Sequence, residues 1–406
     1  MEQPVLSPVR KTAVGVQFLF VAFGSTVLMP LLVGLDPSTA LFSAGVGTLI
    51  FHLVTKGMVP IFLGSSFAYI APIILASKQF ALPGVLAGFA GVALVYFIAA
   101  VLIRWRGSDF INRLFPPVVV GPTIILIGLS LSGTAVNMAS TDWLLAVVSL
   151  LAAIAILIWG RGMFKLLPVI VGVAVGYVVA ICLGKVDFSG LLSASWLALP
   201  QNIAHPQMPQ FAWQPFVCMM PIATASIVEH VGDVYVISQV AEKDFVKNPG
   251  LHRTMFGDGL AILAASLMGG PPVTTYSEVT GAVQITRVTQ PVVLRITAVT
   301  AIVFSVIDKL NALLQSIPQA VLGGIMLLLF GTIASVGIQS LVRNKVDFSD
   351  TRNIIIASVV LTTGIGGAVL SVGSFSLTGI GLSAVIGIIL NLILPQTKTV
   401  SEDEDI

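Results

Sequence analysis

The sequence contains little charge and little cysteine. Asp, Glu, Lys and Arg make up 9% of the 406 residues, and there are 2 cysteines. A soluble domain carries about 25% charged residues, so the composition excludes a soluble globular protein and a disordered chain. The formal net charge of +2 is too small to indicate an anionic macromolecular partner, and we expect no nucleic-acid binding. Because Cys182 and Cys218 both lie in apolar segments, we expect neither a disulfide nor a metal site.

The motifs of soluble enzymes are also missing. The sequence contains no Walker A motif, no zinc-ligand spacing and no nucleophile elbow, and its Gly-x-Gly pairs lie inside apolar runs. The N-terminus lacks a small-residue cleavage site close behind its first apolar run, so we expect that run to remain as a helix. We predict a protein that is not an enzyme and has no cofactor. Transport would then be driven by an ion gradient or by the substrate's own gradient.

Long apolar runs dominate the sequence. Hydrophobic residues make up 56% of the chain, and the mean hydropathy is +1.02. A membrane-spanning helix needs about 20 mostly apolar residues. The sequence therefore predicts an all-α polytopic membrane protein with 14 transmembrane segments, near residues 12–33, 38–56, 64–76, 82–103, 114–132, 142–160, 164–183, 212–242, 250–269, 272–286, 289–307, 317–338, 353–371 and 374–395. The runs at 64–76 and 272–286 are short and are interrupted by Gly, Pro or hydroxyl residues.

The basic residues indicate the orientation. Cytoplasmic loops of membrane proteins are enriched in Lys and Arg. If both termini are cytoplasmic, most of the 20 Lys and Arg residues fall in cytoplasmic loops, whereas Lys78, Lys185 and Lys309 fall in outer loops. We therefore predict a multi-pass protein of the inner (plasma) membrane with both termini in the cytoplasm.

Traces of an internal repeat relate two halves of seven spans each. FPPVVVGPTIIL (115–126) aligns with IPQAVLGGIMLL (317–328), SSFAY (65–69) with TTYSE (274–278), and VAFGS (21–25) with EHVGD (229–233), all at similar offsets. A repeat with an odd number of spans inserts upside down relative to its twin, which is a common plan of secondary transporters. We predict a first repeat at 1–190, a central extracytoplasmic linker at 191–211, a second, inverted repeat at 212–396 and an acidic cytoplasmic tail at 397–406.

The two interrupted runs are the third span of each half. Paired broken segments in corresponding positions indicate a binding site near the membrane midplane. Glu229, Asp233 and Glu278 are ionisable residues deep in predicted spans, where such residues are rare and mark functional sites. Carboxylates that converge on one cavity repel one another, so one of them tends to hold a proton. We expect structural roles for His52, His252, Asp258 and Arg295, with Asp258 near a helix end.

Four motifs carry a family resemblance. GSSFAYIAP (64–72), EHVGD (229–233), KNPGLHRTMFGDGL (247–260) and GGPPVTTYSE (269–278) resemble the nucleobase–ascorbate transporter family, and the resemblance extends over about residues 12–395. It implies fourteen spans in a 7+7 inverted repeat, with short antiparallel strands in the third and tenth spans. It also implies a core domain (spans 1–4 and 8–11), a gate domain (spans 5–7 and 12–14), proton symport, elevator-like movement of the core and a homodimer.

The resemblance also implies roles for individual residues. Glu229 and Glu278 match the two glutamates that bind the nucleobase ring, and Phe67 matches an aromatic residue whose backbone contacts it. Tyr276 matches a tyrosine beside the tenth-span strand, and Ser277 belongs to the same site. Glu229 and Asp233 are the candidates for proton coupling. Further candidates for the site are His230, Ala68 and Gln17.

Several positions depart from the pattern of the uracil-transporting members. Those members have a histidine where this chain has Asp233, whereas purine-transporting members have aspartate there. They have Gly-Glu-Asn where this chain has Ser277–Glu278–Val279, and purine-transporting members have glutamine–asparagine at the last two positions. A first-span histidine is replaced by Phe18. We predict uracil as the substrate, with xanthine or another purine as the alternative, and H⁺ as the coupling ion, with Na⁺ as the alternative.

Two other functions are weighed against this one. A sulfate-permease-like anion transporter would share the span plan, but three carboxylates aimed at one site oppose anion binding. An uncoupled channel or receptor would give uptake that neither saturates nor responds to pH.

Overall fold

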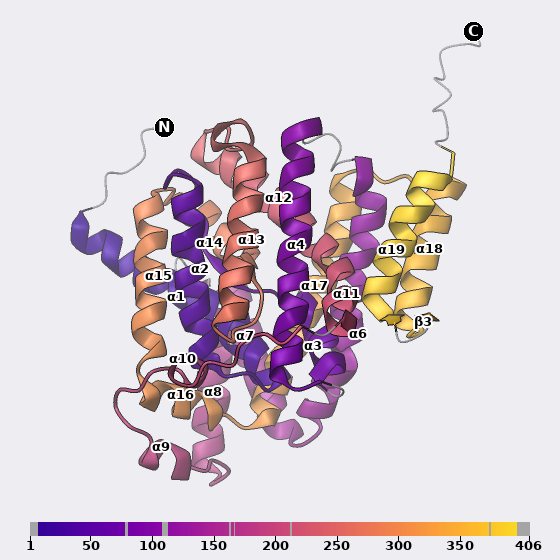
Figure 1. Cartoon of the computed structure of the whole chain (residues 1–406). Helices are drawn as coiled ribbons and strands as arrows, with labels where there is room; N and C mark the ends of the chain where they lie inside the picture. The colour runs from indigo at the N-terminus through magenta and orange to yellow at the C-terminus, as the bar shows by residue number, and fades with distance from the viewer. Residues whose placement is uncertain are drawn as a thin grey trace.

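The computed structural model describes residues 7–77, 80–107, 113–161, 164–165, 167–211, 213–372 and 375–395. The predicted acidic tail at 397–406 lies outside the described residues. Most of the described chain is helical, and the long helices run side by side across the molecule (Figure 1).

The elements of the first half and of the linker follow the predicted runs. They are α1 (Pro8–Val33), α2 (Pro37–Val54), β1 (Leu63–Ser65), the 3₁₀ helix η1 (Phe67–Tyr69), α3 (Ile70–Ser77), α4 (Leu82–Arg106), α6 (Pro117–Ala139), α7 (Trp143–Trp159), α8 (Pro168–Cys182), α9 (Ser189–Ser193) and α10 (Gln201–Ala204).

The second half also begins with helices that are followed by a short strand and a short helix. Its elements are α11 (Trp213–Met219), the 3₁₀ helix η3 (Met220–Ile222), α12 (Ala223–Ala241), the π-helical turn η4 (Val246–Gly250), α13 (Leu251–Leu267), β2 (Val273–Thr275), α14 (Ser277–Thr286), α15 (Pro291–Ser305), α16 (Asp308–Gln315), α17 (Gln319–Arg343), α18 (Thr351–Ile365), β3 (Val369–Val372), β4 (Phe375–Thr378) and α19 (Gly379–Ile393).

Local sequence signals explain where many helices begin. Proline occupies the first turn of α1, α2, α4, α6, α8 and α15, where its missing N–H leaves no hydrogen bond unmade. The Asp36 side chain caps α2 by accepting from the Ser38 and Thr39 amides, and Asp142 caps α7 in the same way. These caps place the first residues of the helices close to the first residues of the predicted apolar runs.

The helices have the length and surface of membrane spans. Among the described residues, six are long and apolar enough to cross a membrane: α1, α2, α4, α6, the α11–α12 segment (Trp213–Ala241) and α17. The bent pair α15 and α16 adds a seventh candidate, and α7, α8, α18 and α19 are shorter apolar helices. Large apolar side chains such as Leu151, Ile158 and Val303 are more than half exposed. Such surfaces fit a lipid environment, so the chain is an integral membrane protein.

Four predicted spans differ in detail from the structure. The run at 212–242 is interrupted by the 3₁₀ helix η3, which contains Pro221, a residue that has no N–H to donate within a helix. The run at 289–307 ends at Ser305, and the next helix turns by 81°. The runs at 353–371 and 374–395 were expected to be helical throughout, but β3 and β4 pair there as an antiparallel hairpin. The β-branched residue Val369 favours the extended conformation.

The two interrupted runs meet at the centre of the molecule. β1 pairs antiparallel with β2, with Gly64 opposite Thr274. Gly64 fits closely there, because a Cβ would lie 3.0 Å from Thr26 Oγ1 and 3.3 Å from the Tyr276 ring. Each strand leads into a short helical segment, η1 and α3 after β1 and α14 after β2. The strands implied by the family resemblance are therefore confirmed.

Two groups of helices surround these strands. α13 packs against α4 and α2, and α15 packs against α1 and α2. In the other group α17 crosses α6 and also contacts α7 and α8. α12 contacts both groups, through α14 and α13 on one side and α6 on the other. The helix that carries two of the predicted site carboxylates thus lies between the groups.

The linker is fastened to the first group of helices. The Ala198 amide donates to the Val306 carbonyl at 3.1 Å, Asn202 Nδ2 donates to the Gly269 carbonyl at 3.1 Å, and Lys309 Nζ donates to the Leu191 carbonyl at 2.6 Å. Beneath it lies a polar cavity of about 160 Å³ whose walls include Asp36, Asp308 and Asn311.

Candidate functional site

One hydroxyl joins two of the predicted carboxylates. Ser277 Oγ lies 2.8 Å from Glu229 Oε1 and 2.9 Å from Asp233 Oδ2. Glu229 and Asp233 lie one turn apart on α12, and Ser277 begins α14. The next residue, Glu278, lies in the first turn of α14. The structure therefore brings together three predicted ionisable residues and Ser277, from segments far apart in the sequence.

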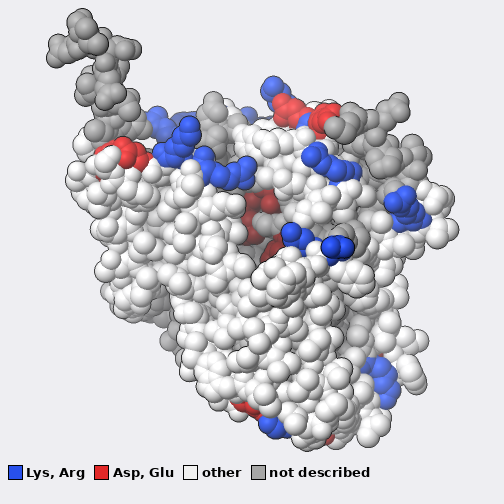
Figure 2. All heavy atoms as spheres, turned by 180° about the vertical axis from the view of Figure 1, so that it is seen from behind, with Lys and Arg blue, Asp and Glu red and all other residues white. Residues whose placement is uncertain are grey.

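The carboxylates border an open hollow. Figure 2 shows acidic side chains recessed in a hollow, with Lys and Arg side chains on the surface around it. Glu278 is exposed and Glu229 is partly exposed, whereas Asp233 is 6% exposed. Gly232 and Gly281, each three residues beyond a glutamate, also border open space, since a Cβ built there would have no neighbour within 4 Å. The hollow thus follows one face of α12 and of α14 away from the strands.

Backbone donors lie beside the carboxylates. The first N–H groups of a helix have no partner within that helix. α14 begins directly after β2, and Tyr276 at its N-cap position makes no capping hydrogen bond with its side chain. In the other broken segment, Ser66 Oγ accepts from the Ala68 amide at 3.3 Å. The site can therefore offer acceptors from carboxylates and donors from the start of α14.

Aromatic residues form the neighbouring apolar surfaces. Phe67 is 7% exposed, and its ring meets the Phe330 ring of α17 edge to face, with centroids 6.2 Å apart. The Tyr276 hydroxyl accepts from the Ser25 amide of α1 at 3.1 Å. The Tyr69 hydroxyl lies 2.6 Å from Ser226 Oγ on α12. Tyr69 and Ser226 were missed from the sequence, although Ser226 lies three residues before Glu229 on the same helix.

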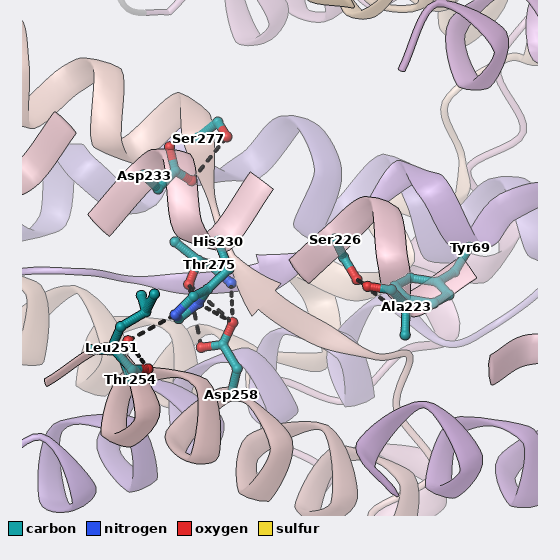
Figure 3. Close-up of polar contacts among 10 residues, drawn as sticks. All are labelled: Tyr69, Ala223, Ser226, His230, Asp233, Leu251, Thr254, Asp258, Thr275 and Ser277. Carbon is teal, nitrogen blue, oxygen red and sulfur yellow. Dashed lines mark hydrogen bonds and ion pairs between the residues drawn. The ribbon is translucent and has the colours of Figure 1, made fainter. Parts of the chain in front are cut away.

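His230 belongs to a separate hydrogen-bonded set behind β2. Its Nδ1 lies 2.9 Å from Asp258 Oδ2 and 2.7 Å from Thr275 Oγ1, and its Nε2 lies 2.9 Å from Thr254 Oγ1 (Figure 3). Asp258 also accepts from the Thr275 amide at 3.1 Å. His230 and Asp258 are both 0% exposed. This set holds the strand that precedes Ser277, and His230 does not face the hollow.

Asp258 was expected near a helix end, and this expectation was wrong. It lies in the middle of α13, which spans Leu251–Leu267. A buried carboxylate in mid-helix needs hydrogen-bond donors, and β2 and His230 supply them. His52 is structural as expected, since its Nε2 contacts the Ile61 carbonyl at 2.9 Å.

The remaining candidates lie at the edge of the site. Ala68 is buried in η1 next to Phe67. Gln17 lies on α1, two turns before Ser25, and no hydrogen bond among the described residues joins it to the carboxylates. Within the same residues no group of three His, Cys, Asp or Glu side chains is close enough to hold a metal ion.

Comparisons with known proteins identify the family. A family model described as "Permease family", for xanthine and uracil permeases, matches residues 10–373. A probable uracil permease of Haemophilus influenzae is 47% identical over 401 residues, which cover 97% of this chain and 96% of that protein. The uracil permease of Bacillus caldolyticus is 45% identical over 421 residues, with 99% and 98% covered.

The fold is shared more widely than the sequence. The inward-facing structure of the murine solute carrier 26 family member A9, an anion transporter, matches with a TM-score of 0.73 at 10% identity. The match covers 96% of this chain and 69% of that one. At this identity it shows the fold alone. Matched by the permease model over residues 10–373 and by relatives over nearly its whole length, the chain belongs to the nucleobase–ascorbate transporter family, whose members are permeases and not enzymes.

Proposed function

We propose that this chain is a secondary active transporter that imports a nucleobase, uracil, together with protons. The observation that carries this proposal is that Glu229 of α12 and Glu278 in the first turn of the half-helix α14 border the same hollow. The relatives in Haemophilus influenzae and Bacillus caldolyticus, named as uracil permeases, support uracil as the nucleobase.

The chemistry of the site suits uracil. The uracil ring has two N–H donors and two carbonyl acceptors in one plane. Glu229 and Glu278 accept hydrogen bonds from the N–H groups, while the first amides of α14 donate to a carbonyl. Phe67 and Tyr276 provide apolar surfaces for the flat ring. Ser277 and Ala68 complete this proposed pocket.

Proton coupling is proposed for Glu229 and Asp233. Both belong to a span, where an ionised carboxylate without a partner is costly. Asp233 is almost fully buried, while Glu229 has access to the hollow, so the proton carried with the substrate resides on this pair. Na⁺ coupling is the alternative, because carboxylates also suit Na⁺.

The span plan is proposed from the family and supported by the pairing of the strands. We propose fourteen spans in two inverted repeats, 1–190 and 212–396, joined by the extracytoplasmic linker 191–211. The antiparallel pairing of β1 with β2, each the third segment of its half, supports two inverted halves. The start of α1 and the end of α19 lie on the same side of the molecule (Figure 1), which supports two cytoplasmic termini.

The two helix groups suggest how the transporter works. The first group, with the strands, corresponds to the proposed core domain, and the group around α6 and α17 to the gate domain. Because α12 and α14 carry the site, elevator-like movement of the core against the gate would expose it to either side. We place the protein in the inner (plasma) membrane, as a homodimer.

Two other substrates are distinguishable. Xanthine or another purine is favoured by Asp233, which purine-transporting members also carry. An anion, as in the murine structure that shares this fold, is disfavoured because three carboxylates at one site repel negative charge.

The test is radiolabelled uracil uptake into vesicles that contain the purified protein. The experiment has three arms: an imposed proton gradient, an imposed Na⁺ gradient, and unlabelled xanthine as competitor. Glu229→Gln should abolish uptake, and Glu242→Gln, the same change at the exposed end of α12, should leave it unchanged.

Each outcome assigns the function. Uracil accumulation that collapses with the proton gradient and ignores xanthine supports the proposal. Competition by xanthine indicates a broader pocket. Uptake that depends on the Na⁺ gradient would mean that Na⁺, and not the proton, is the coupling ion. Folded protein that takes up no uracil would overturn the assignment of uracil as its substrate.

A further inference from the structure

Two of the positions at which this chain departs from the uracil-transporting pattern touch each other. Asp233 stands where those members have histidine, and Ser277 stands where they have glycine. In the structure Ser277 Oγ lies 2.9 Å from Asp233 Oδ2 and 2.8 Å from Glu229 Oε1. Glycine has no hydroxyl, so this link depends on both departures together.

The hydrogen count at this link is informative. A serine hydroxyl has one hydrogen and can donate one hydrogen bond, whereas an ionised carboxylate can only accept. Two ionised carboxylates at hydrogen-bond distance from one Oγ would leave one oxygen pair without a hydrogen. Both contacts are satisfied when one carboxyl group is protonated and donates to Ser277 Oγ, while Ser277 donates to the other.

Among the described residues, no ion pair with a basic side chain replaces that proton. Glu278 follows Ser277 on α14 and has the same charge as the pair, and His230 is bonded to Asp258 behind β2. None of the ion pairs found among the described residues brings a Lys or Arg to these carboxylates. The helices of the other group facing α12 carry no charged residue along α6 and, along α17, only Arg343 at its end.

We propose that Glu229, Ser277 and Asp233 form a bridge that holds one proton, with Ser277 as the positioning residue that stabilises this singly protonated state. This inference rests on the proposed function, in which Glu229 accepts from the nucleobase. An ionised carboxylate accepts more strongly from a nucleobase N–H than a protonated one, so substrate binding favours the state with the proton on Asp233. By linkage, the proton on Asp233 favours substrate binding by the same factor.

The bridge also gives a route for the proton. When Glu229 regains a proton, Asp233 Oδ2–H transfers its hydrogen to Ser277 Oγ. The original Ser277 hydrogen moves to Glu229 Oε1. One O–H bond breaks and one forms at each step, and the negative charge passes from Glu229 to Asp233. No further reactant is required.

The test reads the proton directly in the substrate-free protein. Infrared pH titration of the purified protein in detergent should give the C=O stretching band of a protonated carboxyl group, and Asp233→Asn should remove it. The pair of Glu229 and Asp233 makes two hydrogen bonds to Ser277 when it is singly protonated and one when both carboxyl groups are ionised. Ser277→Ala therefore removes more bonds from the protonated state, and the band should change frequency and titrate roughly half to one pH unit lower.

Matched variants separate this effect from damage to the fold. Ser277→Thr keeps the hydroxyl and should restore the wild-type titration. Thr280→Val removes a hydroxyl from the same helix that bonds only the Tyr276 carbonyl, and it should not shift the band. A band that is independent of Asp233, or that titrates identically in Ser277→Ala, overturns the bridge.

Uracil binding to the same samples distinguishes the two proposals. If the wild type binds uracil but its band titrates as in Ser277→Ala, the proposed transport function stands and the bridge is rejected. Protein that shows the bridge but binds no uracil retains the bridge and loses uracil as its substrate. If Ser277→Ala weakens binding without moving the titration, Ser277 only orients Glu229, and the proton-holding role is rejected.

Discussion

His230 and Asp258 are joined by a 2.9 Å contact between Nδ1 and Oδ2, and neither side chain is exposed. The same carboxylate accepts the Thr275 amide at 3.1 Å and therefore fixes the end of β2. Because Ser277 and Glu278 follow β2 by two and three residues, the position of the proposed site depends on a contact that lies behind it (Figure 3).

Replacing Asp258 should therefore reduce both stability and binding. Asp258→Ala leaves the buried Thr275 amide without its side-chain acceptor, and it removes one of the two polar contacts of His230 Nδ1. Unpaired buried groups of this kind cost about 1–3 kcal/mol each. We expect a lower thermal unfolding midpoint in detergent and weaker uracil binding. Asp244→Ala, at an exposed loop carboxylate, is the control and should match the wild type in both measurements. An Asp258→Ala protein with wild-type unfolding and binding would remove the supporting role.

The two glutamates should differ in what they control. Glu229→Gln replaces the charged acceptor that is linked to the proton by a neutral amide that cannot titrate, and binding of uracil should be lost. Glu278→Gln places in this position the residue that purine-transporting members carry. A hydrogen bond to a charged group contributes about 1.5–3 kcal/mol, so uracil affinity should fall by roughly 10- to 150-fold. Equilibrium binding of labelled uracil, with and without xanthine, measures both effects. Unchanged affinity in Glu278→Gln would place Glu278 outside the pocket.

The sequence predicted the helices and the carboxylates because their signals are local. Twenty-residue apolar runs and proline-containing helix starts identify α1, α4 and α6 without knowledge of the fold. Glu229, Asp233 and Glu278 are conspicuous because charge is rare in spans. The half-helices were predicted from their Gly, Pro and hydroxyl residues, which interrupt the apolar runs.

What the sequence could not supply are contacts between distant segments. The Ser277 contact with Asp233 spans 44 residues, and the Tyr69 contact with Ser226 spans 157. No spacing rule within one helix predicts such pairs. Asp258 was misjudged for the same reason, because its partners Thr275 and His230 lie on other elements. The β3–β4 hairpin was missed because its apolar residues continue the pattern of the neighbouring helices.

The contact between Asp233 and Ser277 predicts that substitutions at these two positions have coupled effects on uptake. Asp233→His should lower uptake when Ser277 is present, because the larger ring meets its hydroxyl, whereas Asp233→His with Ser277→Gly restores the family pattern. We expect the double variant to take up more uracil than either single variant. A double-mutant cycle on initial uptake rates measures this coupling, which for contacting residues is about 0.5–3 kcal/mol. Additive effects of the two changes would mean that the positions act independently.

The edge-to-face pair of Phe67 and Phe330 predicts a contribution of the second helix group to binding. Phe330 lies on α17 and is 2% exposed, while Phe67 lies on η1 beside the proposed pocket. Aromatic pairs of this geometry contribute about 0.5–1.5 kcal/mol beyond their buried area. Phe330→Ala should therefore weaken uracil binding by roughly 2- to 12-fold, because Phe67 loses the ring that holds it, while the hydrogen bonds of Ser277 remain.

A second aromatic pair provides the matched control for this prediction. Phe20 and Phe304 also meet edge to face, with centroids 6.1 Å apart, but on α1 and α15 away from the carboxylates. Phe304→Ala should leave the uracil dissociation constant unchanged, although it removes the same kind of contact. Equal losses of affinity in both variants would mean that the effect is general destabilisation. A loss confined to Phe330→Ala would mean that α17 supports the pocket through Phe67, so movement of one helix group against the other must break this contact and change the affinity for the substrate.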